Sequence, residues 1–430
     1  MESIWQLDAA LPEFPLLSGE IKTDVLVIGG GLAGLLTAHC LRKMGVDTIL
    51  VESNRICSGT TAYTTAKITA QHGFIYHKIL RSYGAEAAKS YYSANSEAVG
   101  QLKALCLETD CPMEEKPNFI YSTNRRKLEA ELDALQKLGI PFLYDDAPPL
   151  PVATAGAVGF PDQAQFHPLK LAAHLARDLE IFEQTRVTEL IGTTALTEHG
   201  TIRAKKIVVA THFPFLNKHG SYFLKLYQHR SYLLALEHAG CLTGMYVDDD
   251  KKGMSFSSFG DKLLLGGGGH RTGKQGGSYT ELCHFAREHY PQAREKLRWA
   301  AQDTMSLDGI PYIGNYSANT PDLYVAAGFN KWGMTGSMVS AEMISAIITG
   351  NKPDYASVFS PSRSILKPQL LCNITETTAN FLIPTTKRCP HLGCALKYNA
   401  AEHSWDCSCH GSRFSESGRV LNNPANDDLK

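Results

Sequence analysis

Three glycines between two short apolar runs constrain the fold of this 430-residue chain more than any other feature. The run 24–28 ends at Gly29-x-Gly31-x-x-Gly34, an apolar helical pattern follows, and a second β-rich run ends on Glu52. This order predicts a βαβ unit whose first turn binds a dinucleotide. Gly29 permits the tight turn, Gly31 lets a pyrophosphate approach the helix N-terminus, and Gly34 lets helix and strand pack closely. The alternative is a plain βαβ unit without a ligand.

The residues that follow Glu52 indicate which dinucleotide is bound. A nicotinamide-binding domain continues with further parallel strands, whereas this chain enters a small, hydroxyl-rich segment, 58–67, suited to lie against phosphate and flavin. Glu52 is expected to accept a hydrogen bond from a ribose hydroxyl. Besides the glycines and Glu52, the predicted cofactor contacts in this part of the chain are Leu32, Ala33, Ser53, Thr60 and Thr61. Helical patterns follow at 85–109 and 125–138, and strands are predicted at 182–190 and 206–210.

Two later motifs, Asp308-Gly-Ile-Pro-Tyr-Ile-Gly314 and the run 324–335, extend the pattern. Together with the glycine turn, Arg186-Val187 and Ala210-Thr-His-Phe-Pro214, they resemble the FAD-dependent oxidoreductases of the d-amino-acid oxidase type, a family that includes glycine, sarcosine and gamma-glutamylputrescine oxidases. The resemblance covers about residues 22–350. It implies an α/β fold, in which a Rossmann-like FAD-binding domain carries an inserted β-rich substrate domain.

The same resemblance assigns roles along the loop 328–335. Val187 would meet the adenine through its backbone, and the loop would close on the isoalloxazine through Gly328, Gly333, Met334 and Thr335. The apolar helical pattern after Gly333 agrees, because a helix N-terminus stabilises negative charge on a reduced flavin. The candidate catalytic residues, Lys331 and Trp332, would supply an ammonium for the flavin or oxidant and a wall or amine cage. A plain glycine-rich loop is the alternative.

The substrate half is expected in the β-rich material near 220–300 and in part of 75–150. Family members that take simple amino acids hold the carboxylate with an arginine shortly before the Asp-Gly-x-Pro motif, where this chain has Gln302. This departure argues against a simple amino-acid substrate. The remaining polar candidates are Arg230, His270 and Arg271, each expected to be a surface or loop residue. Lys67 is a weaker functional candidate than Lys331 and Trp332, since a solvated loop lysine would look the same.

Cysteine and histidine are concentrated in two short strings near the C-terminus, Cys389-Pro-His-Leu-Gly-Cys394 and Cys407-Ser-Cys-His-Gly-Ser412. Two irons bridged by sulfide need two thiolates on one iron and two imidazoles on the other, and each string offers one of each. A structural zinc site is the competing interpretation.

The two strings closely resemble the Rieske [2Fe-2S] family, in the members that have two extra cysteines. The resemblance implies Cys389 and Cys407 as ligands of the inner iron, His391 and His410 as ligands of the outer iron, and a disulfide between Cys394 and Cys409. Only residues 361–388 precede the first string, so the base of this domain is expected to be abbreviated or borrowed from the flavin domain. Residues 372–384 are predicted to form one or two short strands. Phe414 replaces the tyrosine of the high-potential members, which predicts a lower potential.

The expected domains are discontinuous: 1–75, 151–220 and 301–355 bind FAD, 76–150 and 221–300 form the substrate domain, and 361–430 form an abbreviated all-β Rieske domain. Lys plus Arg total 42 against 43 for Asp plus Glu, and no basic run suits nucleic acid. No apolar stretch suits a membrane span, and no signal peptide is evident, so a cytoplasmic protein is expected.

The predicted function is an oxidoreductase that uses FAD and a [2Fe-2S] cluster. It would dehydrogenate a C–N bond of a small amine or amino-acid derivative and exchange electrons with an external donor or acceptor through the cluster. Two alternatives remain open: an oxygen-using FAD amine oxidase with a structural metal-binding tail, and a redox sensor or electron carrier without a small substrate.

Overall fold

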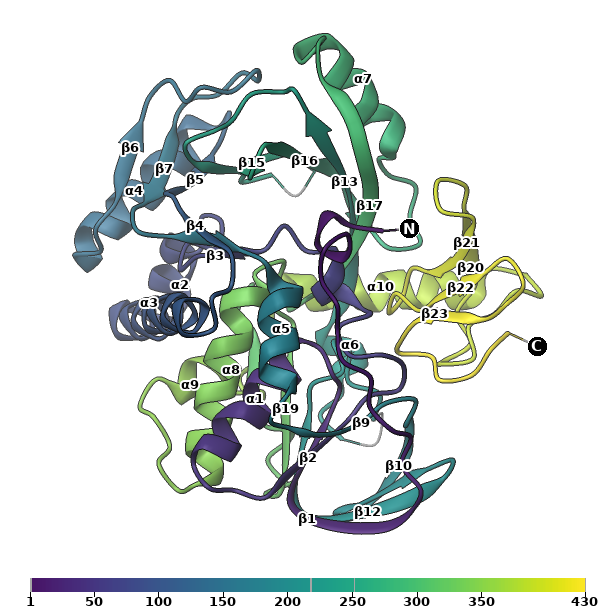
Figure 1. Cartoon of the computed structure of the whole chain (residues 1–430). Helices are drawn as coiled ribbons and strands as arrows, with labels where there is room; N and C mark the ends of the chain where they lie inside the picture. Colours follow the sequence, from purple (N-terminus) through teal and green to yellow (C-terminus); the bar gives the residue numbers. More distant parts are fainter. Residues whose placement is uncertain (1, 217–218, 251, 430) are drawn as a thin grey trace.

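The glycine turn follows the central strand of a mainly parallel sheet. The structure is a computed structural model that describes residues 2–216, 219–250 and 252–429. The strands of this first sheet are β1 (Gly19–Ile28), β2 (Thr48–Val51), β9 (Glu180–Phe182), β10 (Val187–Ile191), β11 (Thr194–Thr197), β12 (Gly200–Val209), β18 (Tyr312–Asn315) and β19 (Leu323–Ala327). They run in the order β10-β11-β12-β1-β2-β9, with β19 beside β12 and β18 beside β19 (Figure 1).

Strand β1 forms the centre of this sheet and pairs in parallel with β2 and β12. Its last four residues are buried apolar side chains, as expected for a strand covered on both faces. The strand predicted at 182–190 is interrupted: β9 ends at Phe182 and β10 begins at Val187, because Gln184 between them has a positive φ of 52°.

Helices cover the first sheet and extend from it. Helix α1 packs against α8, and α3 packs across α8. The expected helices at 85–109 and 125–138 are α3 and α4. The helices are α1 (Leu32–Lys43), α2 (Tyr76–Tyr83), α3 (Ala85–Glu108), α4 (Arg125–Leu138), α5 (Pro168–Ala176), α6 (Tyr222–Lys225), α7 (Tyr279–His289), α8 (Gly333–Ile348), α9 (Ala356–Phe359) and α10 (Pro368–Leu382), with 3-10 turns η1 (Ile4–Gln6) and η2 (Thr60–Tyr63).

A second sheet lies above the first in the view of Figure 1. Its strands are β5 (Asn118–Tyr121), β6 (Leu143–Asp145), β7 (Ala157–Phe160), β13 (Tyr227–Glu237), β14 (Met245–Asp248), β15 (Ser255–Phe259), β16 (Lys262–Arg271) and β17 (Arg294–Met305). They run in the order β17-β13-β16-β15-β14-β5-β7-β6. A small sheet of β3 (Lys67–Ile68), β8 (Ala164–Phe166) and β4 (Met113–Glu115) lies between the two large sheets (Figure 1).

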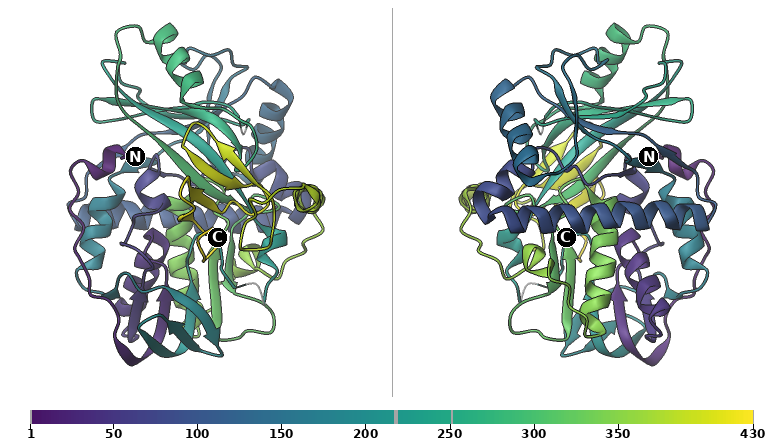
Figure 2. Two further views of the ribbon diagram at one scale, coloured as in Figure 1. Left: turned by 90° about the vertical axis from the view of Figure 1, so that its right-hand side faces the viewer. Right: turned by 90° about the vertical axis from the view of Figure 1, so that its left-hand side faces the viewer.

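The C-terminal domain is a small antiparallel sheet beside β13 and β17 (Figures 1 and 2). Its strands are β20 (Leu396–Asn399), β21 (Ser404–Cys407), β22 (Arg413–Ser415) and β23 (Val420–Asn422). The prediction of strands at 372–384 is wrong, because α10 occupies most of that segment. Pro368 is preorganised for the first turn of the helix, and the buried Asn373 and Asn380 lie seven residues apart on one helical face. Within the described residues, every helix is too short or too polar to cross a bilayer.

A buried ion pair fastens the segment that leads from the FAD-binding domain to α10. Arg363 donates from Nε and Nη2 to the two carboxylate oxygens of Asp308, each at 2.8 Å. Burial opposes ionisation of Asp308, but the Arg363 guanidinium holds its pKa below the ordinary value. The remaining Arg363 donors bind backbone carbonyls, including that of Pro311 at 3.0 Å. The chain therefore leaves the FAD-binding domain through a fixed point.

We expect Arg363→Ala to lower the free energy of unfolding by about 3–5 kcal/mol, because it leaves the Asp308 carboxylate buried without its partner. Urea denaturation measures the change. Lys205→Ala is the control: its pair with Asp24 is exposed and should contribute less than about 1 kcal/mol. Equal losses in the two variants would contradict a structural role for the Arg363 pair.

Candidate functional site

The turn after β1 is so tightly packed that Gly29 and Gly34 have no room for side chains. A Cβ on Gly29 would lie 2.6 Å from the carbonyl oxygen of Ala210, and one on Gly34 would lie 1.9 Å from that of Gly29. Gly31 is the N-cap of α1, and a Cβ there would meet only the Thr61 hydroxyl, at 3.4 Å. Gly29 and Gly34 therefore bring strand and helix together, and Gly31 keeps the helix N-terminus accessible. This arrangement fits a bound dinucleotide phosphate.

Glu52 lies beside this turn at the end of β2. One carboxylate oxygen accepts from the Gly30 amide at 2.7 Å, and the other accepts from the Ser53 hydroxyl and the Asn54 amide at 3.0 and 2.9 Å. The carboxylate is thus oriented next to the helix N-terminus, where an adenosine ribose is bound in this type of fold.

The other predicted cofactor contacts surround the same region. The Thr61 hydroxyl accepts from the Leu32 amide at 3.1 Å, and the Thr60 hydroxyl donates to the carbonyl of Gln302 at 3.1 Å. Ala33 lies in the first turn of α1, and Val187 is buried at the start of β10. These contacts connect the turn after β1 to the second sheet. The individual roles of the residues toward FAD stay predictions.

The loop before α8 is held in an unusual backbone conformation. Asn330 and Lys331 both have positive φ, at 54° and 75°, and Gly328 has a φ of 73°. Thr335 anchors the start of α8 by accepting from the Thr69 amide at 2.9 Å. Non-glycine residues seldom adopt such angles, and they are concentrated at functional sites.

The Trp332 indole stacks on the ring of His72, with centroids 5.2 Å apart. His72 donates from Nε2 to the Thr69 carbonyl at 2.8 Å and accepts at Nδ1 from the Tyr91 hydroxyl at 2.6 Å. Burial lowers the pKa of His72 to about 3, so this ring stays neutral and supports the indole. A lone histidine gives no sequence signal for such a role.

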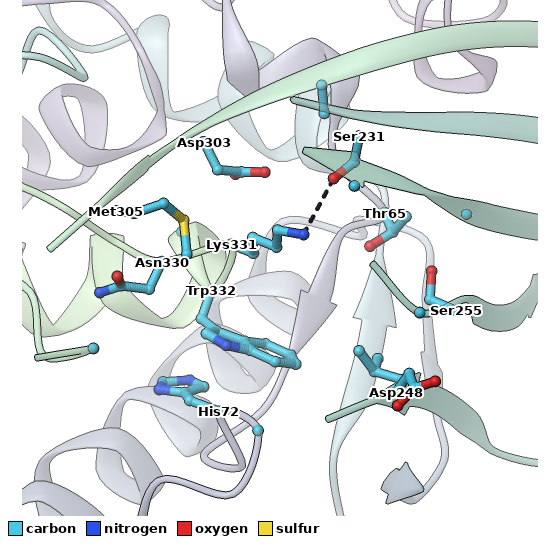
Figure 3. A pocket seen from close by; sticks show the side chains of 18 of the residues that line it. Thr65, His72, Ser231, Asp248, Ser255, Asp303, Met305, Asn330, Lys331 and Trp332 are labelled. Atoms are coloured by element: carbon cyan, nitrogen blue, oxygen red, sulfur yellow. Dashed lines mark hydrogen bonds between the residues drawn. The ribbon is translucent and has the colours of Figure 1, made fainter. Parts of the chain in front are cut away.

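A cavity of about 380 Å³ lies between this loop and the second sheet (Figure 3). The residues that matter most to its chemistry are Lys67, Ser231, Asp248, Asp303, Lys331 and Trp332. The Lys331 ammonium donates to the Ser231 hydroxyl at 3.2 Å. The structure therefore brings the two candidate catalytic residues, Lys331 and Trp332, to one cavity.

Burial changes the titration of three groups around this cavity. It raises the pKa of Asp303 to about 6, although the nearby Lys331 and Arg230 favour the ionised form. It also raises the pKa of Asp248. Burial, assisted by the charge of Lys116, lowers the pKa of Lys67 to about 7. Lys67 is thus no solvated loop residue, and Asp303 is a functional candidate that the sequence did not reveal.

The two cysteine loops, 389–394 and 407–412, share one backbone pattern. In each loop the first amide donates to the last carbonyl at 2.9 Å, and the fifth amide donates back to the first carbonyl, at 2.8 Å in one loop and 2.9 Å in the other. The fifth residue is a glycine with positive φ in both, Gly393 at 77° and Gly411 at 84°. The loops form two similar knuckles that face each other.

The knuckles bring the predicted cluster ligands together. The Sγ atoms of Cys394, Cys407 and Cys409 lie within 4.8 Å of one another, and Cys407 also contacts Cys389. The rings of the two histidines lie with centroids 5.0 Å apart, His391 against His410. All four cysteines are free thiols in the structure, so the Cys394–Cys409 disulfide stays a prediction.

The orientation of His410 fits a metal ligand. Its Nε2 donates to the Phe223 carbonyl at 3.1 Å, and its buried Nδ1 has no hydrogen-bond partner among the described residues. A ligating histidine binds the metal through one nitrogen and hydrogen-bonds through the other. Two thiols, two imidazoles and this orientation fit a [2Fe-2S] cluster held by mixed ligands.

The polar residues expected at the surface are instead buried or half-buried, and the two arginines among them bind the C-terminal domain. Arg230 donates from Nε to Glu402 at 2.7 Å, and Arg271 donates to the carbonyls of Ser408 and Cys409 at 2.9 and 3.0 Å. His270 is also buried, on β16. The expectation of surface positions is wrong for Arg230 and His270, which are buried, and Arg271 is half-buried. For the two arginines the reason is that their partners lie in the C-terminal domain, far along the chain.

The comparisons with known proteins agree with this geometry. The FAD dependent oxidoreductase (DAO) family matches residues 24–347, and the Rieske [2Fe-2S] domain matches residues 372–430. The putative Rieske 2Fe-2S iron-sulfur protein YhfW of Bacillus subtilis is 33% identical over 496 residues, which cover 100% of this chain and 97% of the relative. Gamma-glutamylputrescine oxidoreductase of Escherichia coli is 23% identical over 79% of this chain and 86% of its own.

Among solved structures, glycine oxidase from Geobacillus kaustophilus is similar in fold, with a TM-score of 0.68, 21% identity, and coverage of 80% of this chain and 99% of that chain. The α/β fold and the two expected cofactors, FAD and a [2Fe-2S] cluster, are thereby confirmed. The chain belongs to the FAD dependent oxidoreductase family and carries a C-terminal Rieske [2Fe-2S] domain.

Proposed function

We propose that the chain dehydrogenates a C–N bond of an amine or amino-acid derivative in the 380 Å³ cavity and passes the electrons to the cluster. FAD, when bound, supplies a two-electron acceptor, and the cluster supplies a one-electron carrier. The coarser assignment, an FAD oxidoreductase of the amino-acid and amine oxidase type with a Rieske domain, rests on the family matches. The finer assignment, dehydrogenation of a C–N bond with electron transfer to the cluster, rests on the strands β13 and β17.

These two strands form a wall between the cavity and the cluster loops. Neighbouring residues of a strand point to opposite faces. Ser231 and Asp303 line the cavity, whereas the residues next to them, Arg230 and Gln302, contact the Rieske domain. Gln302 donates to the carbonyl of Gly411 in the second cluster loop at 2.9 Å. This single layer of backbone is the observation that carries the proposed relay.

The charges of the cavity favour an amine over a simple carboxylate. Asp248 and Asp303 are carboxyl groups on its wall, and no arginine lines it in the described parts of the chain. Ionised Asp303 stabilises a substrate ammonium, and Lys67, with a pKa of about 7, is available to accept the proton that the ammonium must lose. Similarity to an enzyme named for gamma-glutamylputrescine supports the same substrate class.

The test is anaerobic purification followed by visible absorption, low-temperature EPR after dithionite reduction, and assays for iron, sulfide and zinc. We expect a flavin spectrum with a Rieske-type signal and about two irons per chain, as one [2Fe-2S] centre requires. Flavin accompanied by zinc or by empty thiols would contradict the relay and favour an oxygen-using amine oxidase. An amine screen that never bleaches the flavin would contradict the substrate class.

We expect Asp303→Asn to raise the KM for a cationic amine roughly tenfold or more, because a hydrogen bond to a charged group contributes about 1.5–3 kcal/mol. Since the pKa of Asp303 is raised to about 6, the carboxyl is neutral below that pH and ionised above it. Amine binding to the unmodified chain should therefore strengthen as pH rises through 6, and the variant should lose this dependence. Asp261→Asn, which alters an exposed carboxylate paired with Lys262 outside the cavity, is the control.

We expect Phe414→Tyr to raise the reduction potential of the cluster. Phe414 is fully buried in the same apolar group as the four cysteines, and a tyrosine there would bring a hydroxyl, a hydrogen-bond donor, into their surroundings. A hydrogen bond that favours the reduced form by about 1 kcal/mol raises the potential by roughly 40 mV. Voltammetry on the loaded protein measures the shift, with Phe414→Leu as the control. A downward shift, or none, would contradict the argument.

A further inference from the structure

Helix α10 has its apolar side turned outward. Asn373 and Asn380 are its buried residues, whereas most of its large apolar side chains are exposed. Together with the residues that flank the helix, they form a surface that we call the α10 patch: Leu366, Leu371, Ile374, Phe381, Leu382 and Ile383. Leu366, Leu382 and Leu371 are 83%, 74% and 66% exposed. The four members within α10 are spaced three, seven and one residues apart, which places them on one stripe of the helix: Leu371, Ile374, Phe381 and Leu382.

Polar contacts on the other side of α10 fix this orientation. Asn373 donates to the Leu224 carbonyl at 3.1 Å and accepts from Arg271 at 2.9 Å. Glu376 on the same side forms an ion pair with Lys274. Turning the apolar stripe inward would break all of these contacts. Figure 2 shows α10 at the edge of the molecule, seen along its axis in the left-hand picture.

Basic residues stand at both ends of the patch. Lys367 precedes α10, and Lys387 and Arg388 follow it. Arg388 is held over the patch by donating to the carbonyls of Phe381 and Ile383 at 3.2 and 2.9 Å. In residues 361–395 the sequence has one acidic residue, Glu376, and its carboxylate is paired on the inner side. The surface is therefore apolar along its length and positive at its ends.

These charges favour an anionic partner over a second copy of the chain. In a symmetric pair of antiparallel helices, Lys367 of one copy would face Lys387 and Arg388 of the other, and like charges would repel. A protein partner is also a poor match, since specific protein interfaces mix apolar anchors with about one hydrogen bond per 100–200 Å². The polar side chains that interrupt the stripe are two small threonines, Thr375 and Thr378, and the Thr375 hydroxyl already donates to the Leu371 carbonyl at 3.0 Å.

We propose that the α10 patch docks on the surface of a lipid bilayer that contains anionic lipids. An apolar helical face flanked by lysine and arginine is the arrangement that lies in the membrane interface, with apolar side chains among the acyl chains and basic groups at the phosphates. Docking brings the first cluster loop to the membrane, because a Cβ on Gly393 would lie 3.5 Å from the Phe381 ring. This inference goes beyond the proposed function, which names no surface.

The test is co-sedimentation of the full loaded chain with vesicles of phosphatidylcholine, alone or mixed with phosphatidylglycerol. We expect binding to the mixed vesicles, weaker binding at high salt, and little binding to phosphatidylcholine alone. The double variant Leu371→Gln with Leu382→Gln should lose at least tenfold in partitioning. Leu107→Gln is the matched control, since Leu107 on α3 is 73% exposed, close to the 74% of Leu382, and lies outside the patch.

Visible absorption and thermal unfolding verify that each variant is folded and loaded. Equal binding by the double variant and the parent would overturn the proposal, as would no binding to the mixed vesicles. A concentration-dependent dimer in light scattering that the double variant abolishes would assign the patch to a second copy instead. Vesicle binding requires no turnover, so its outcome is independent of the proposed dehydrogenation.

Discussion

The ion pair between Arg230 on β13 and Glu402 in the C-terminal domain is buried, and the arrangement of the two domains depends on it. Two charges removed from water are tolerated only when each is closely paired and hydrogen-bonded. Arg413 contacts Glu402 at 3.1 Å and also donates to Asp406 at 3.0 Å, so the network continues into the cluster domain. Any displacement of that domain would expose one of these charged groups to water or leave it buried without its partner. The Rieske domain is therefore a fixed part of the flavin protein.

That fixed contact gives the second sheet two functions at once. One face of β13 and β17 closes the cavity through Ser231 and Asp303, and the other receives the Rieske domain through Arg230 and Gln302. The alternation of side chains along a strand makes this possible without additional structure. The strands β13 and β17 of the flavin protein thereby also cover one side of the C-terminal domain.

The sequence predicts best what the local backbone determines. The turn from Gly29 to Gly34 and the loop 407–412 owe their shape to residues a few positions apart, so their spacing alone indicates the ligand type. The roles of Arg230 and Arg271 depend on partners more than a hundred residues away and leave no local pattern. The pKa of Asp303 depends on burial, which is a tertiary property. The prediction of strands at 372–384 fails because the buried face of α10 is polar and most of its apolar residues face outward.

The Arg271 contacts with the carbonyls of Ser408 and Cys409 fasten the second cluster loop itself to the flavin protein. Gln302 fastens the neighbouring Gly411 in the same loop. A cluster held in this way cannot swing between a donor and an acceptor, so the proposed relay would have its tunnelling distance fixed by the fold. Its transfer step would be governed by driving force and not by solvent viscosity or by the length of a tether. Such a relay would trade the reach of a mobile carrier for a constant internal rate.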